Sequence, residues 1–250
     1  MSISRQLLVN KILEETRKVE RPDKIRIRAF RALDDVQASI KFHKGHSDVL
    51  GAYGIRGLTT LNPVWIDDEN VYVILVESLD GKHVYGGARV QISSPNTELP
   101  IESGIGYLDG SIHEIVKQYR ENGGVAEICG LWNSPVVAGM GIGSTFSIRS
   151  SFAYASKLPI TSMFALCSPY TYRMAGSFGF TKLKSMGNEG VFPYPDEKNT
   201  AIVTFQPNIE EMTGASEEER TFIFNLRKNP VQIIAEDVGK PNPIEVHYHL

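Results

Sequence analysis

The spacing of apolar positions in the first part of the chain alternates between helix-like and strand-like periods. One apolar face among charged residues predicts a helix over 1–20, and alternating apolar and basic positions over 21–30 predict a strand. Residues 34–53 are predicted to form two short helices separated at Lys44 and Gly45, because glycine weakens a helix interior. This part of the chain therefore contains both kinds of element.

Two strands and a longer helix are predicted next. The apolar runs 71–80 and 83–92 flank a Gly-Lys pair, which is typical of an antiparallel hairpin. Ser111 followed by Glu114 has the spacing of a capping box, in which each side chain binds a free backbone amide at the start of a helix. Apolar residues then recur at helical spacing as far as Gly123, so we expect a helix between these two points.

The segment 125–180 carries the most informative pattern. A mostly apolar strand is predicted over 125–132, a glycine-rich loop follows it, and a helix then continues to about Lys157. A second buried strand is predicted over 160–167, followed by a short helix and a Gly-Phe pair.

The last part of the chain is predicted to add strands and one long helix. Strands are expected over 178–186 and 199–207. A helix over 208–229 has Ser216 as its cap and three glutamates in its first turn, where the helix dipole favours acids. Residues 231–250 are expected to hold one strand and then a proline-rich tail.

The composition agrees with a globular protein. Of 250 residues, 42% are hydrophobic and 22% are charged, which excludes collagen-like and wholly disordered classes. The 26 Lys and Arg nearly balance the 29 Asp and Glu, so no basic surplus indicates a nucleic acid or an anionic membrane as partner. The sequence contains no run of about 18 apolar residues, so we predict no membrane span. The charged start lacks the pattern of a signal peptide, so we expect a cytoplasmic protein.

The cysteines and histidines give no sign of a metal or a disulfide. Cys129 and Cys167 each lie inside an apolar run, which predicts two buried thiols in a reducing compartment. His43 and His46 have helical spacing for a shared metal, but no third ligand is evident nearby. We therefore predict no metal site, and the sequence leaves the oligomeric state open.

The glycines after the first buried strand suggest a phosphate site. Such a loop lets a ligand approach the backbone, and the following helix offers unpaired amides and a partial positive charge. Together these features suit a pyrophosphate, although such a turn can also be purely structural. The residues expected to bind it are Ala138, Gly139, Met140, Gly141, Ile142, Gly143 and Ser144.

A dinucleotide-binding oxidoreductase is an alternative for the same loop. Two observations oppose it, because the loop comes late, after an antiparallel hairpin, and no acidic residue suited to a ribose ends the strand 160–167.

The order of the segments VAEICGLW, AGMGIGSTFSIRSSFAYASK, ITSMFALC and SPYTYRMAGSFGF resembles the core of the GCN5-related N-acetyltransferase (GNAT) superfamily. The resemblance covers roughly residues 25–206, and a strand with Glu in the place of Glu127 also occurs in its autoinducer-synthase branch. It implies an α+β, GNAT-like three-layer fold with a central mixed twisted sheet flanked by helices. Residues 42–55 occupy the stretch that usually shapes the acceptor pocket.

The resemblance also implies a binding mode for acetyl-CoA or a longer acyl-CoA as co-substrate. A splayed strand pair would expose backbone at Leu131 and Trp132 to the pantetheine arm, and the glycine loop would bind the pyrophosphate. Two positions depart from the family pattern. Ala138 stands at the Arg or Gln position of the loop, and Ala175 replaces the tyrosine that commonly protonates the leaving thiolate. Tyr172 is the candidate substitute for that acid, with Tyr170 as a second choice.

Glu127 is the candidate base. An alkyl amine with a pKa near ~10 is almost wholly protonated at neutral pH and must lose a proton before it attacks a thioester. A carboxylate on a buried strand can have its pKa raised and accept that proton, directly or through water. The structural alternative is an acid that faces solvent or pairs with Arg149 or a lysine. Backbone near Gly130 and Leu131 is expected to polarise the thioester carbonyl.

These predictions combine into one expected function and one alternative. The chain is predicted to be an N-acyltransferase over 21–207, with an amino-terminal helix over 1–20 and a carboxy-terminal helix, strand and tail over 208–250 packed on the same domain. The donor is acyl-CoA or an acyl carrier protein, and the acceptor is a small-molecule amine or amino acid. The alternative is a degenerate member that binds acyl-CoA as a sensor or scaffold without turnover.

Overall fold

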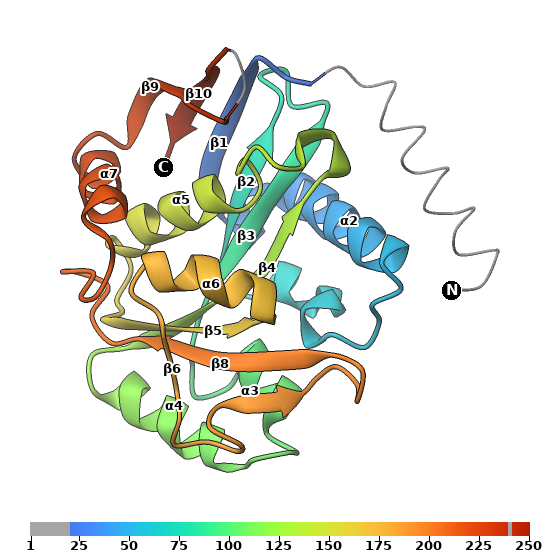
Figure 1. The fold of residues 1–250 in the computed structure, drawn as a ribbon, viewed down its shortest axis with the longest axis vertical. Helices are drawn as coiled ribbons and strands as arrows, with labels where there is room; N and C mark the ends of the chain where they lie inside the picture. The colour runs from blue at the N-terminus through green and yellow to red at the C-terminus, as the bar shows by residue number, and fades with distance from the viewer. Residues whose placement is uncertain (1–20, 240–241) are drawn as a thin grey trace.

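The computed structural model describes residues 21–239 and 242–250, and one mixed sheet forms the centre of these residues (Figure 1). Its ten strands are β1 (Lys24–Arg31), β2 (Val71–Glu77), β3 (Val84–Ile92), β4 (Val125–Asn133), β5 (Ser162–Cys167), β6 (Thr181–Lys182), β7 (Val191–Pro193), β8 (Thr200–Gln206), β9 (Val231–Glu236) and β10 (Ile244–His249). The strand order is β6-β8-β5-β4-β3-β2-β1-β10-β9, with β7 also paired to β8. The predicted helix over 1–20 lies outside the described residues.

Helices cover both faces of the sheet. The α-helices are α2 (Val36–Ala52), α3 (Pro100–Ile105), α4 (Ser111–Glu121), α5 (Thr145–Ala155), α6 (Pro169–Ser177) and α7 (Glu217–Lys228). Short 3₁₀ helices are η1 (Ala32–Asp35), η2 (Thr59–Leu61), η3 (Pro63–Asp67) and η4 (Pro135–Val137). Figure 1 shows α5, α6 and α7 in front of the sheet and α2 behind it. The predicted α+β, three-layer architecture with a mixed central sheet is confirmed.

The alternation of side chains along the strands creates the two cores. Successive residues of a strand point to opposite faces, so β2 places Ile74 in the core under α5 and Val73 and Leu75 in the core under α2. A separate apolar cluster lies under α3 and α4, where Val116 packs near Phe164. Each face of the sheet is therefore apolar, which is why polar side chains on it stand out.

Only two strand pairs in the described sheet are parallel, β4 with β5 and β1 with β10. The other pairings are antiparallel. A dinucleotide-binding domain of the doubly wound type has a mostly parallel sheet. The topology therefore opposes the dinucleotide alternative.

The prediction of two helices over 34–53 is wrong, because α2 is continuous. Gly45 lies inside it, where an added Cβ would come within 2.2 Å of the Trp132 ring. The glycine marks a close approach of helix and strand and does not end the helix. Asp35 caps the start of α2, since its carboxylate accepts a hydrogen bond from the Ala38 amide at 3.0 Å.

The capping box at Ser111 is also wrong. Ser111 is the first residue of α4, preceded by Gly110, and its hydroxyl donates to Asp109 Oδ1 at 2.7 Å. Because Asp109 also accepts the Ser111 amide at 3.0 Å, the serine side chain is not the cap.

Two strand predictions on the carboxy-terminal part need correction. The strand expected over 178–186 is only the two-residue β6, and the proline-rich tail after β9 contains β10. β10 pairs in parallel with β1, and its residues Ile244, Val246 and Tyr248, which alternate with polar residues, are buried in the core.

The helix expected over 208–229 is shorter in the structure: α7 begins at Glu217, directly after its cap Ser216, and residues 208–216 are not helical. The Ser216 cap is confirmed, and α7 packs on α5.

Among the described residues, no helix combines the length and the apolar character needed to cross a membrane. Within the same residues, no group of three His, Cys, Asp or Glu side chains is arranged to hold a metal ion.

Candidate active site

β4 and β5 are joined at their starts and then diverge. The parallel register links Val125 to Ser162 and Glu127 to Phe164, and no later pair of these two strands is joined in the described sheet. Beyond this point β4 continues beside β3, and β5 continues beside β8 as far as Cys167. A gap therefore opens in the middle of the sheet.

A cavity of about 310 Å³ occupies this gap, and we call it the splay cavity. The two strands line it with residues 127–131 and 165–168. From the α5 and α6 face it is lined by Ile148, Met174 and Ala175, and from the α2 face by His46, Leu50, Ile55, Leu58, Thr59 and Tyr194. The cavity therefore passes through the sheet and has walls on both faces.

β4 carries a bulge beside the splay cavity. Arg89 pairs with Cys129 and Gly87 with Trp132, so β4 has one more residue than β3 between these two pairs. Gly130 adopts a left-handed φ of 59°, which glycine reaches without the steric cost of a side chain. Backbone at Gly130 and Leu131 is therefore released from the ladder where it borders the cavity.

Glu127 is buried and lines the splay cavity, with 2% of its surface exposed. Its Oε2 accepts a hydrogen bond from the Ile101 amide at the start of α3, at 2.7 Å. No described residue is within hydrogen-bond distance of Oε1. Arg149, the partner considered from the sequence, instead binds Glu219, with Nε and Oε2 2.6 Å apart.

Burial raises the pKa of Glu127 to about 8, because the ionised carboxylate loses its hydration in the cavity wall. The Ile101 hydrogen bond and the charge of Arg89 oppose this rise, and the charge of Glu102 adds to it. A carboxyl group that titrates near neutral pH is suited to accept and release a proton.

The glycine loop joins η4 to the start of α5. Gly139 and Gly141 have left-handed φ values of 77° and 70°, which turn the chain from the strand end into the helix. The side chains of Met140 and Ile142 are buried in the core, while Ala138 is exposed. The loop thus presents backbone to solvent at the amino-terminal end of α5.

Some of the backbone amides in the glycine loop already donate hydrogen bonds within the chain. Gly143 donates to Asn133 Oδ1 at 3.0 Å, and Ser144 donates to the Gly141 carbonyl at 3.2 Å. The amides of Gly139, Gly141 and Ile142 donate to no other described residue. Gly139 and Gly141 therefore offer free donors at the positive end of the α5 dipole, whereas Ile142 is fully buried.

The candidate acid is not at the splay cavity. Tyr172 is half-buried against the core and does not line the cavity, and Tyr170 is 85% exposed. Ala175, which stands where the resemblance led us to expect a tyrosine, does line it. Tyr194 reaches the cavity from another element, and its hydroxyl accepts a hydrogen bond from the Thr59 amide at 2.8 Å.

Leu131 and Trp132 of β4 were both expected at the cofactor, but their side chains lie in different surroundings in the structure. Leu131 lines the splay cavity, whereas the Trp132 ring packs edge-on against Phe42 of α2, with ring centroids 6.0 Å apart. Cys129 also lines the cavity, and burial raises the pKa of its thiol to about 12, so it stays protonated at neutral pH.

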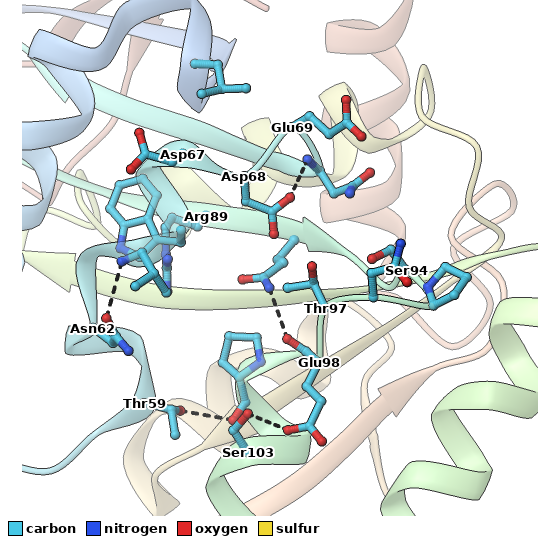
Figure 2. Close-up of a pocket in the computed structure, with 18 residues that line it drawn as sticks. Thr59, Asn62, Asp67, Asp68, Glu69, Arg89, Ser94, Thr97, Glu98 and Ser103 are labelled. Atoms are coloured by element: carbon cyan, nitrogen blue, oxygen red, sulfur yellow. Dashed lines mark hydrogen bonds between the residues drawn. The ribbon is translucent and has the colours of Figure 1, made fainter.

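A second and larger cavity, about 910 Å³, lies on the α2 face beside β3, and we call it the acidic cavity. Its inner wall includes Arg89, Gln91 and Trp65, and Thr59 lines both cavities. Figure 2 shows Arg89 at the back, with Asp67, Asp68 and Glu69 on one side and Glu98 on the other.

The sequence did not single out this second cavity or Tyr194. Arg89 lies in an otherwise apolar run of a predicted strand, and a charge at such a position is the one signal that would have marked it. Tyr194 and the acids belong to segments without a regular pattern, so only the folded chain brings them together.

No protein-family model and no curated protein sequence matches the chain. Among solved structures, FeeM, an N-acyl amino acid synthase from uncultured soil microbes, aligns with a TM-score of 0.50 at 14% identity, over 75% of this chain and 99% of FeeM. The CoA-dependent acyl-homoserine lactone synthases MesI and BjaI both align with a TM-score of 0.49, at 14% and 15% identity. These alignments cover 85% and 90% of this chain and 98% and 94% of theirs. The likeness to FeeM concerns the fold alone.

Proposed function

We propose that this chain, which has the fold of the GCN5-related N-acetyltransferase (GNAT) superfamily, transfers an acyl group from acyl-CoA, or from an acyl carrier protein, to the nitrogen of a primary amine. The observation that carries the proposal is the position of Glu127, a buried carboxyl group with a pKa of about 8 in the wall of a cavity between two diverging strands. FeeM, an N-acyl amino acid synthase of this fold, supports acyl transfer as the reaction class.

The donor would bind from the α5 face. The free amides of Gly139 and Gly141, with the α5 dipole, suit the pyrophosphate of CoA, and contacts of this kind contribute about 0.3–2 kcal/mol from the dipole alone. From there the pantetheine arm would enter the splay cavity along Leu131 and place the thioester beside the bulge.

The acceptor amine would approach from the α2 face. Its uncharged nitrogen attacks the thioester carbonyl carbon, and a C–N bond forms while the carbonyl π electrons move to oxygen. Glu127 accepts the proton that the nitrogen loses, at the Oε1 atom that has no other partner. The C=O bond then re-forms, the C–S bond breaks, and its electron pair leaves with sulfur.

Backbone rather than a charged side chain would stabilise the oxyanion. The bulge releases the backbone of Gly130 and Leu131 beside the cavity, and an amide there is a fixed donor that needs no reorganisation during the reaction. Holding both reactants in one cavity contributes through orientation as well.

The proton for the leaving thiolate has no side-chain donor at Ala175. A thiol with a pKa near that of cysteine, about 8.5, leaves as a thiolate with little assistance in mildly alkaline solution. Tyr172 stays our candidate for this proton, reached through water, because Tyr172 does not itself line the cavity.

The test is release of the CoA thiol, measured with a thiol reagent and checked by the mass of the product. Acyl-CoA donors from acetyl to dodecanoyl are combined with a panel of amino acids and simple amines. We expect release that depends on the amine, and a loss of at least about tenfold in kcat/KM in the Glu127→Gln variant. The matched control is Glu236→Gln, a buried glutamate on β9 outside both cavities, whose pKa is also raised by burial.

A second function, acyl-CoA binding without turnover, is favoured by Ala138 and Ala175, which lack the side chains that the family pattern has there. Acyl-CoA would then raise the melting temperature, while no amine of the panel would release thiol. That result would overturn the transferase proposal. Amine-dependent release would overturn the binding-only function.

A further inference from the structure

Arg89 on β3 is a buried cation without a salt bridge. It is 1% exposed, and no carboxylate of a described residue lies within 4 Å of its guanidinium. Its Nε and Nη1 atoms are enclosed and have no hydrogen-bond partner in the described part of the chain. The guanidinium instead stacks on the Trp65 ring, 4.4 Å from the ring centroid. Such a group is costly unless something compensates its charge.

The neighbours of Arg89 do not supply a compensating negative charge at neutral pH. Cys129, directly across the strand pair, has a thiol whose pKa burial raises to about 12. Burial also raises the pKa of Glu127 to about 8, so this carboxyl group is mainly protonated at neutral pH. Burial lowers the pKa of His46 to about 3 and also lowers that of His43, so both rings are neutral.

A second unpaired donor lies at the same place. The indole Nε1 of Trp65 is buried and has no partner among the described residues, and Trp65 and Arg89 both line the acidic cavity. Two donor groups without acceptors at one cavity wall indicate a ligand that brings acceptor oxygens.

The rest of the cavity favours a ligand that is also cationic. Among its described lining residues Arg89 is the one basic residue, whereas Asp67, Asp68, Glu69 and Glu98 are acidic. Figure 2 shows Asp67 and Asp68 on the side nearest Arg89, Glu69 farther along and Glu98 on the opposite side. These carboxylates would repel a free anion such as phosphate, and they would attract a molecule that carries an ammonium group beside its carboxylate.

The spacing of Arg89 and Glu127 fits such a molecule. Arg89 lies opposite Cys129, and Gln91 lies opposite Glu127, so Arg89 and Glu127 are diagonal neighbours on one face of the sheet. Diagonal neighbours in an antiparallel pair are about 7–8 Å apart, which side chains of this length span. Arg89 lines the acidic cavity and Glu127 lines the splay cavity, and Thr59 lines both, so a small zwitterion that spans the two cavities there can contact both residues.

We propose that the acceptor is an α-amino acid whose carboxylate is bound by Arg89, which places its amino group beside Glu127. This inference rests on the proposed function and names the acceptor class of the same site. The carboxylate of the ligand supplies the negative charge that the guanidinium of Arg89 lacks beside it. The amino group of the ligand is then held next to Glu127. The acids at the opening favour amino acids with a neutral or basic side chain.

The first test compares each amino acid with its carboxamide and with its decarboxylated amine as acceptors. With a fixed acyl-CoA, the wild type should prefer the free carboxylate. In Arg89→Gln the kcat/KM for amino acids should fall by roughly 10- to 100-fold, mainly through KM, as expected for loss of one hydrogen bond to a charged group. The carboxamides should be affected little, and Arg89→Lys should restore part of the preference.

The control variant is Arg120→Gln. Arg120 lies near the same cavity, but its guanidinium is already bound, since Nη1 donates to Ser93 Oγ and to the Ser94 carbonyl, both at 3.3 Å. This variant should keep the wild-type preference for the carboxylate.

The second test measures binding without any acyl donor. Amino acids should raise the melting temperature of the wild type, while their carboxamides and inorganic phosphate should not, and Arg89→Gln should lose the effect. Binding of this kind without thiol release would remove the proposed function and keep Arg89 as a carboxylate site. Thiol release that is equal for amino acids and carboxamides would overturn the inference and keep the function. The absence of both a carboxylate preference and binding would also overturn it.

Discussion

Gln91 and Glu127 lie directly opposite each other on β3 and β4, and both hold the segment that leads into α3. Gln91 Nε2 donates to the Glu98 carbonyl at 3.3 Å, and Glu127 accepts from the Ile101 amide at 2.7 Å. Gln91 lines the acidic cavity and Glu127 lines the splay cavity. One cross-strand pair thus has one member in each cavity and holds the segment 98–101 beside both.

The activity should depend on pH through Glu127. Its pKa of about 8 means that the fraction in the basic, ionised form rises as pH increases through that value. We therefore expect kcat/KM to increase from pH 6 to about pH 9 in the wild type. In Glu127→Gln the rate should be lower by about tenfold or more, and the step near pH 8 should be absent. The measurement is a pH–rate profile, and an identical profile in both proteins would exclude Glu127 as the base.

The same group should make stability depend on pH. Because the pKa of Glu127 is raised in the folded chain from about 4.5 to about 8, the folded state binds more protons than the unfolded state between these values. Stability therefore falls as pH rises through this window. Glu127→Gln should remove this part of the loss, which urea unfolding at pH 5 and pH 8 would measure for both proteins. A pH dependence that the substitution leaves unchanged would contradict the raised pKa.

The bulge should require glycine at position 130. In Gly130→Ala a left-handed φ of 59° would be imposed on alanine, and its Cβ would come 3.2 Å from Arg89 Nε. We expect a loss of about 1–2 kcal/mol of folding free energy and a lower kcat. The control is Gly51→Ala in α2, where a Cβ meets open space, so stability should increase by about 0.5–1 kcal/mol. Thermal unfolding and thiol release measure the two effects, and a neutral Gly130→Ala would argue against a structural need for the bulge.

Arg89 should cost the protein stability when no ligand is bound. A buried cation without a compensating charge is costly, so replacing it by an apolar side chain of similar length is expected to be neutral or stabilising. Arg89→Met should therefore melt at the same temperature as the wild type or higher, and it should lose the amino-acid preference. A strongly destabilised Arg89→Met would indicate that the guanidinium serves the fold.

Arg149 shows the opposite case of a buried arginine with full partners. It binds Glu219 through two hydrogen bonds and approaches Glu236 Oε2 at 3.5 Å, while Tyr248 donates to Glu236 Oε1. Arg149→Met would leave two buried carboxylates without a cation, and we expect a loss of about 3–5 kcal/mol in urea unfolding.

The control for Arg149 is Arg31→Met, which removes an exposed pair with Asp34 and should change stability little. Equal effects of the two substitutions would contradict the role of burial. A partial recovery of Arg149→Met at low pH, where the carboxylates are protonated, would support it.

The sequence was most informative where structure is local. The apolar runs over 125–132 and 160–167 correspond to β4 and β5, because a strand buried on both faces needs apolar residues throughout. The glycine loop and the short helix after β5 were also predicted, since glycines mark the turn and Ser168 and Pro169 mark the start of α6.

Features that depend on distant partners were not predicted. Gly45 was interpreted as a helix break, but its role is to let Trp132 approach, and that contact joins residues far apart in the chain. The bulge at Gly130 is defined only by its register with β3. Arg89 is a candidate binding residue because no described acidic side chain pairs with it, and only the folded chain shows this. Local pattern contains none of this information.

The parallel pairing of β1 with β10 has a consequence for how the molecule is made. β1 begins at Lys24, and its neighbour on one side comes from residues 244–249. During translation one edge of β1 therefore lacks its hydrogen-bond partner until nearly the whole described chain has left the ribosome. Loss of the β10 residues, by proteolysis or by a premature stop codon, would expose that edge to other molecules and favour aggregation.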